Sequence, residues 1–134
     1  MVNEKKAQAD SVNTIRALSN LGVGQKKIRV VFNKMDTDES VADEFPSLFG
    51  LAAKEKGFIA NPDAVIHLNE VYERLKSVGK SLAEISADPI DYRAKFKEIT
   101  DQEEKVMCLN MVALKRLAVT ANKNLDDVFK ALFK

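Results

Sequence analysis

The chain has 134 residues and a formal net charge of +1, from 21 Lys and Arg against 20 Asp and Glu. This length suits one domain, residues 1–134, with a real core. The balanced charge excludes the electrostatic footprint of a protein that binds nucleic acid or an anionic membrane directly. A single cysteine, Cys108, excludes an internal disulfide, and no apolar run resembles a signal peptide or a membrane span, so we expect a cytoplasmic protein.

The first third of the chain predicts a helix, a turn and a buried strand. Apolar residues at helical spacing predict a helix over 4–20, and Gly22 is suited to end it. The short β-branched run Ile28–Phe32 is typical of an interior strand of a parallel sheet. The segment Gly22–Lys27 superficially suggests a phosphate loop, but it precedes the strand instead of following it. We therefore interpret it as a helix cap and turn.

Beyond the strand the sequence becomes helix-rich. Asp38 or Ser40 can cap a helix that reaches about residue 56, with a separate or kinked first turn because of Pro46. A second short strand is expected at 58–60. Further helices are expected at 67–77, from 81, at 91–99, at 101–121 and from 124 or 125 to 133. The helix at 101–121 is apolar around most of its circumference, so we expect it to be largely buried.

The run Asn33-Lys34-Met35-Asp36 directly follows the predicted interior strand. An Asn amide and an Asp carboxylate at this place can bond the ring edge of a nucleotide base. The same two residues could instead form an Asx turn that caps the next helix. No Gly-x-x-x-x-Gly-Lys-Ser/Thr follows a strand, so the chain itself has no phosphate-cradling loop.

In order and spacing, several short segments resemble the C-terminal part of StbB, a ParA/MinD-like P-loop ATPase family of plasmid stability and conjugation systems. The resemblance covers nearly the whole chain, and the segments that carry it are Gln8–Ile15, Gly22-Val23, Arg29–Asn33, Ala60–Asp63, Asn69–Tyr72, Asp91–Arg93 and Arg116–Ala118.

This resemblance implies the C-terminal portion of a P-loop NTPase, an α/β fold with a mostly parallel sheet wrapped by helices and one or two strands in this chain. It implies ATP and Mg²⁺ as cofactors of the intact protein, and a small DNA-binding protein as partner in plasmid segregation or conjugation. The Walker A half is absent, so we expect no catalytic residue here. We also expect the chain to pair with that half or to self-associate.

The nucleotide-binding residues that the resemblance implies are Asn33 and Lys34, with Asp36 as a departure from the family. Asp36 completes an Asn-Lys-x-Asp pattern that GTPases use to recognise guanine, which leaves GTP open beside ATP. Asn61, Pro62 and Asp63 form a candidate base-side loop, although the same residues suit an ordinary turn.

His67 is the single histidine, with Asp63 and Glu70 nearby in sequence. A metal site needs several converging ligands, so we interpret His67 as a structural polar group and expect no metal. Two hypotheses follow. The chain is the base-binding part of a plasmid-stability ATPase, or it is a free-standing helical adaptor that binds a protein partner without a nucleotide.

Overall fold

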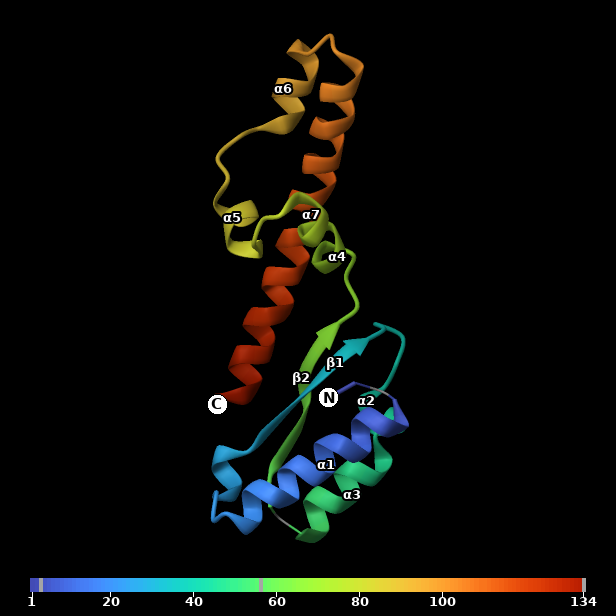
Figure 1. Ribbon diagram of the computed structural model, residues 1–134, viewed down its shortest axis with the longest axis vertical. Helices are drawn as coiled ribbons and strands as arrows, with labels where there is room; N and C mark the ends of the chain where they lie inside the picture. Colours follow the sequence, from blue (N-terminus) through green and yellow to red (C-terminus); the bar gives the residue numbers. More distant parts are fainter. Residues whose placement is uncertain (3, 56, 134) are drawn as a thin grey trace. The chain divides into compact units, whose positions relative to one another are not determined.

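The computed structural model describes residues 1–2, 4–55 and 57–133, and it divides into two compact units. Unit 1 comprises Met1–Leu68 with Asn124–Lys134, and unit 2 comprises Asn69–Lys123. The protein is mixed α/β and mostly helical, with a two-stranded parallel sheet flanked by helices (Figure 1). The expectation of one domain concerns independent folding and stays a prediction.

Unit 1 holds the sheet and the helices around it. Its elements are α1 (Lys5–Asn20), the 3-10 turn η1 (Gln25–Lys27), β1 (Arg29–Met35), α2 (Val41–Glu44), α3 (Pro46–Glu55), β2 (Ile59–His67) and the last turns of α7 (Gln102–Leu132). Gly22 adopts a φ of 89° just after α1, which confirms the helix cap and turn expected there. Pro46 begins α3 directly after α2, which confirms the separate first turn.

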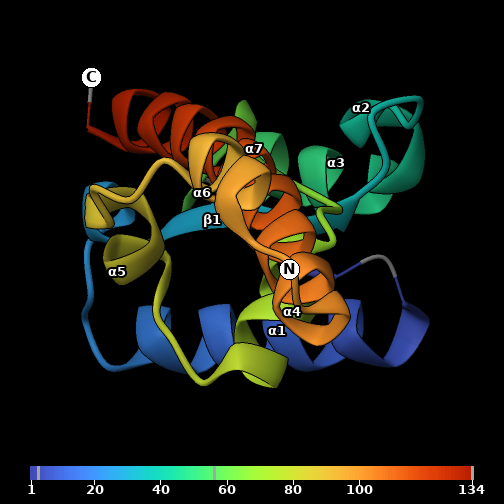
Figure 2. The same ribbon diagram turned by 90° about the horizontal axis from the view of Figure 1, so that it is seen from above.

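The core of unit 1 forms on one side of β1. Val30 and Phe32 alternate toward the interior, as the pleat of a strand requires, and Phe32 is fully buried. Its ring centroid lies 4.9 Å from that of Phe45 and 5.5 Å from that of Phe49. Figures 1 and 2 show that α1 and the C-terminal end of α7 lie on different sides of the strands.

Strand β2 is longer than the sequence predicts. It pairs in parallel with β1 and continues through Asn61, Pro62 and Asp63 to His67, where a turn and the start of a helix were expected. The side-chain hydrogen bond typical of a turn forms within the strand: Asn61 Oδ1 accepts a hydrogen bond of 2.9 Å from the Asp63 N–H. The pairing register shifts across this segment, so the strand bulges instead of ending.

The edge of β2 that faces away from β1 is bonded by the side chain of Asn124 on α7. Asn124 Oδ1 accepts a hydrogen bond of 3.0 Å from the His67 N–H, and Asn124 Nδ2 donates one of 2.7 Å to the Val65 carbonyl. In addition, Asn61 Nδ2 donates to the carbonyl of Ala131 at 3.0 Å. One asparagine amide thus takes the place of an adjacent strand.

Unit 2 is helical, and capping residues close in sequence mark the ends of its helices. It contains α4 (Val71–Val78), α5 (Leu82–Ala87), α6 (Tyr92–Glu98) and α7 as far as residue 123. Ser81 Oγ accepts from the Glu84 N–H, and Asp91 Oδ1 accepts from the N–H groups at the start of α6, so both helices begin at the residues expected and each has a side-chain cap. Its core comprises Val71, Leu75, Ile85, Met111, Leu114, Ala118 and Ala121.

Helix α7 differs from the sequence prediction in two ways. It is one continuous helix where two were expected, because Asn124 faces β2 instead of beginning a new helix. The expectation that its apolar residues are largely buried is also wrong. Val106, Leu109 and Val119 are 50%, 54% and 71% exposed, although Cys108 on the same helix is buried. Apolar composition alone does not show which side of a helix finds a partner.

Replacement of Asn124 by Ala should lower the free energy of unfolding by about 1–3 kcal/mol, because two backbone groups of β2 lose their partners. The measurement is urea unfolding followed by circular dichroism, with hydrogen exchange of the His67 amide as a local probe. Asn110→Ala is the matched control, because Asn110 is an exposed residue of the same helix. Equal stability of the two variants would contradict the role given to Asn124.

Candidate functional site

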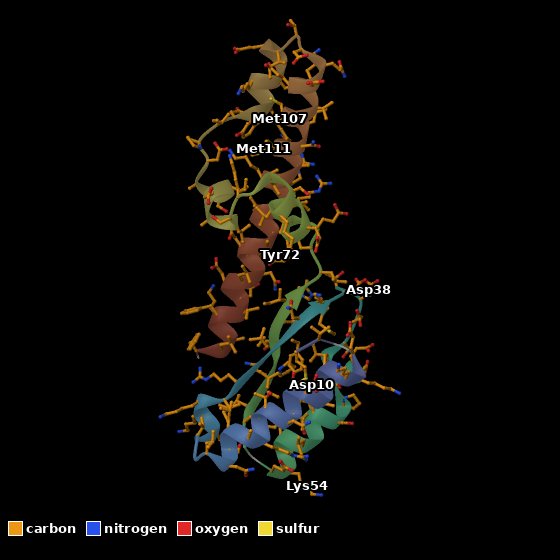
Figure 3. All side chains as sticks on the ribbon, viewed as in Figure 1. Asp10, Asp38, Lys54, Tyr72, Met107 and Met111 are labelled. Atoms are coloured by element: carbon orange, nitrogen blue, oxygen red, sulfur yellow. The ribbon has the colours of Figure 1, made fainter. Side chains whose placement is uncertain are left out.

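The predicted base-reading residues lie at the carboxyl end of β1. Asn33 and Lys34 belong to the strand, and Asp36 begins the turn that follows it. Figure 3 labels Asp38 in this turn, just beyond the end of β1. In parallel α/β sheets, ligands bind outside the carboxyl ends of the strands. The sequence therefore places these residues where such a fold puts its ligand.

The backbone at this end of β1 adopts an unusual conformation. Lys34 has a φ of 55°, in the left-handed region, and it is the one non-glycine residue with positive φ in the described part of the chain. This conformation costs a lysine ~1 kcal/mol. Asn33 Oδ1 accepts a hydrogen bond of 2.9 Å from the Lys34 N–H. Within the described residues, the Asn33 Nδ2 donor has no partner.

Asp36 makes local hydrogen bonds. Its N–H donates to Glu39 Oε1 at 3.0 Å, and its Oδ1 accepts from the Asp38 N–H at 3.4 Å. These bonds are those that the turn interpretation requires, and the Asp36 side chain is exposed beside them. The Asx turn is thus present at Asp36 in the free chain, whereas Asn33 lies in β1 and its side chain accepts from the adjacent Lys34 N–H. Base recognition by the two residues stays a prediction.

A hollow of about 480 Å³ in unit 1 brings β2, the start of α2 and α7 together. Among its lining residues are Pro62, Asp63, His67, Asn124 and Asp127. Two of the three candidate base-side residues therefore share one hollow, whereas Asn61 bonds α7. Asn33, Lys34 and Asp36 are not among the residues that line it. The structure does not bring the two predicted groups into one cavity.

His67 lines this hollow at the end of β2. Its Nδ1 atom is buried and has no hydrogen-bond partner among the described residues. The hollow is acidic, because Glu39, Asp63 and Asp127 also line it. In the described part of the chain, no group of three His, Cys, Asp or Glu residues is placed to hold a metal ion.

Segments that resemble parts of a phosphate loop have structural explanations. The residues from Gly22 to Lys27 lead from α1 through η1 into β1, which is the wrong order for a phosphate loop. Gly79-Lys80-Ser81 has the Gly-Lys-Ser sequence with which a phosphate loop ends, but it joins two helices instead of following a strand. Gly79 ends α4 with a φ of 66°, and Ser81 caps α5.

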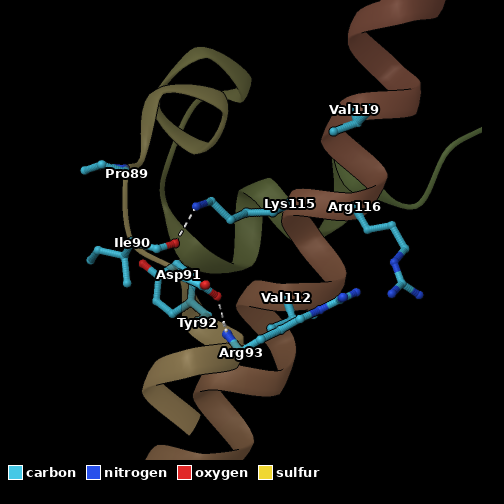
Figure 4. Close-up of a pocket in the computed structure, with 9 residues that line it drawn as sticks. All are labelled: Pro89, Ile90, Asp91, Tyr92, Arg93, Val112, Lys115, Arg116 and Val119. Atoms are coloured by element: carbon cyan, nitrogen blue, oxygen red, sulfur yellow. Dashed lines mark hydrogen bonds between the residues drawn. The ribbon is translucent and has the colours of Figure 1, made fainter.

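A second hollow, of about 490 Å³, lies in unit 2 between the start of α6 and α7 (Figure 4). Beside it, the Tyr92 hydroxyl donates to Asp88 Oδ2 at 2.5 Å. Lys115 Nζ donates to the carbonyls of Asp88 and Ile90 at 2.7 and 2.6 Å and lies 5.2 Å from the centre of the Tyr92 ring. Sequence reasoning missed this network, although the four-residue spacing of Asp88 and Tyr92 was a visible signal.

The Tyr92–Asp88 hydrogen bond changes the pKa values of both groups. The bond to Asp88, then burial and the Asp88 charge, raise the pKa of Tyr92 to about 12. The bond from Tyr92, then one from the Ile90 N–H, lowers the pKa of Asp88 below its ordinary value of 3.8. The stabilisation from Tyr92 is present below pH 10 and is lost as the pH rises toward 12. That from Asp88 is lost as the pH falls through its lowered pKa.

Among the helices of the described residues, none is both long enough and apolar enough to cross a membrane. In comparisons with known proteins, no family model matches this chain, and no curated protein and no solved structure is similar to it.

Asp88→Asn should lower the pKa of Tyr92 from about 12 toward the ordinary tyrosine value of 10.0, because the negative acceptor is lost. The measurement is an ultraviolet titration of the two tyrosines, with Tyr72→Phe to remove the other signal. Asp101→Asn is the control, since Asp101 is an exposed acid of unit 2. An unchanged high pKa in Asp88→Asn would show that burial, and not the hydrogen bond, dominates.

Proposed function

We propose that this chain is the base-side and helical C-terminal portion of a ParA/MinD-like P-loop ATPase that acts in plasmid stability, segregation or conjugation. The observation that carries the proposal is the Asn33-Lys34-x-Asp36 run at the carboxyl end of β1, a strand with a parallel neighbour. The motif lies at the end of a strand, as a base-reading site requires, and the StbB-like order of the segments is the basis for the proposed family.

The strained backbone at Lys34 supports a binding role. A lysine in the left-handed region costs free energy that glycine would not cost, and such strain is concentrated at ligand sites. The conformation accompanies the bond from the Lys34 N–H to Asn33 Oδ1. The Asn33 Nδ2 donor is thereby left for an acceptor on a ring edge, since it has no partner among the described residues.

The second edge of β1 also bears on the proposal. Backbone groups of a strand point alternately to its two edges, so Arg29, Val31 and Asn33 present theirs away from β2. Met1 bonds Val31 and Asn33 there, and Val2 forms a parallel bridge with Asn33. Arg29 has no neighbouring strand on this edge in the described chain. Parallel strands of a half that carries the Walker A loop would have to displace Met1 and Val2 to pair with this edge.

In this proposal the chain reads the base, and the other half holds the phosphates and Mg²⁺. Because those contacts lie outside this chain, hydrolysis by this polypeptide alone is not expected. The family favours ATP. Asp36 favours GTP, because its exposed carboxylate can accept from the N1 and N2 donors of guanine. A small DNA-binding protein is the proposed partner of the assembled ATPase.

Base contacts without phosphate contacts should give weak binding that does not depend on phosphates. We expect adenosine and ATP, or guanosine and GTP, to bind with equal dissociation constants on the order of 1 mM. The measurement is a nuclear magnetic resonance titration that follows the backbone amides of residues 33–36. Asn33→Ala should abolish the shifts, and the preferred base decides between ATP and GTP.

The control for this titration is Asn110→Ala, which removes an exposed amide far along the sequence and should bind as the unchanged chain does. Binding that survives in Asn33→Ala would contradict the role of Asn33. An affinity for ATP far above that for adenosine would show a phosphate site in this chain and would contradict the division of labour proposed above.

A second proposal, a free-standing helical adaptor, is favoured by one observation. Unit 2 exposes large apolar side chains on α7, among them Val106, Met107 and Val119. Exposed apolar groups of this size are typical of interaction surfaces. The two proposals differ in the titration, because an adaptor predicts no shifts at residues 33–36 with either nucleoside.

A further inference from the structure

The hollow of unit 2 combines apolar walls with positive charge. Val112 and Val119 of α7 line it, and Val119 is 71% exposed. Arg93 of α6 and Arg116 of α7 line it as well, and Figure 4 shows both side chains extending beside Val112. Its volume of about 490 Å³ suits a few side chains of a partner.

The two arginines are the cations available to a partner. Lys115 is already bonded to the carbonyls of Asp88 and Ile90, and the Asp91 carboxylate caps α6. By contrast, Arg93 and Arg116 are exposed, and their guanidinium groups have no ion pair or hydrogen bond among the described residues. Guanidinium groups beside apolar surface favour carboxylates that are flanked by apolar side chains.

The same chain carries a surface with this chemistry. The start of α7 exposes Glu103 and Glu104, followed by Val106 and Met107 at 50% and 67% exposure. Figure 3 labels Met107 on this part of the helix. Neither carboxylate has an ion pair in the described part of the chain. The acids suit the N-terminal end of the helix dipole, but helix formation does not account for the two exposed apolar side chains.

We propose that the start of α7 in one copy of the chain docks into the α6–α7 hollow of a second copy. The two surfaces cannot meet within one molecule. They lie on one continuous helix, and from Glu104 to Arg116 the helix rises roughly 18 Å. The contact joins two different surfaces, so it is heterologous: an open assembly leaves one of each free at its ends, and a closed ring leaves none. This inference does not rest on the nucleotide role.

Knock-out variants of each surface test this contact. The unchanged chain should associate with rising concentration in sedimentation velocity experiments, and added salt should weaken the association. Arg93→Ala with Arg116→Ala removes the cations of the hollow, and Glu103→Ala with Glu104→Ala removes the acids of the helix start. Each double variant alone should associate about 10-fold more weakly, because two exposed ion pairs contribute up to about 1 kcal/mol each.

An equimolar mixture of the two double variants provides the decisive result. One intact helix start and one intact hollow remain, so the mixture should form a one-to-one dimer and nothing larger. Arg74→Ala with Lys76→Ala, on α4, is the control for the arginine double variant, because it also removes two positive charges. It should associate like the unchanged chain. Circular dichroism verifies that each variant is folded.

Three results would overturn the proposal. The first is an unchanged chain that stays monomeric at all concentrations, which would leave the hollow to a different protein. The second is a mixture of the two double variants that stays monomeric. The third is a control variant that weakens association as much as the others, which would show an effect of overall charge.

Discussion

A pair of parallel strands has two outer edges, and their backbone groups need hydrogen-bond partners. Unit 1 is organised around this requirement. On the β2 side, the Asn124 amide bonds the backbone of Val65 and His67, so a helix takes the place of a strand. On the β1 side, Met1 bonds part of the edge. The β1 edge is thus covered in part by the N-terminal residues, and the proposed nucleotide role requires a further strand to take their place.

The two units rely on different kinds of interaction. Unit 2 is specified by signals close in sequence, such as the Ser81 and Asp91 caps and the left-handed Gly79 at the end of α4. Unit 1 depends on contacts between distant segments, including the Phe32 and Phe45 rings and the bonds of Asn61 and Asn124 with segments far away in sequence. Local signals can be read from a sequence, whereas the second kind exists only after folding.

This difference explains which parts of the protein could be predicted. The β-branched run before Asn33 correctly indicated a strand, although β1 continues to Met35 and includes Asn33 and Lys34. Pro46 correctly indicated a separate first turn before the main helix. The extent of β2 could not be read, because Asn61-Pro62-Asp63 has turn chemistry and becomes part of a strand only through a bulge opposite β1. The hollow lined by Asp63 and His67 could not be predicted either, because Asn124 and Asp127, which also line it, are far away in sequence.

The left-handed conformation of Lys34 also bears on how related sequences should vary. At a positive φ, glycine and asparagine are the residues that fold at least cost, so a position under selection for the turn alone drifts toward them. A lysine that persists there among relatives is kept for its ammonium group or its long alkyl stem, against the preference of the backbone. Substitution patterns at this one position would therefore separate selection on ligand contact from selection on chain geometry.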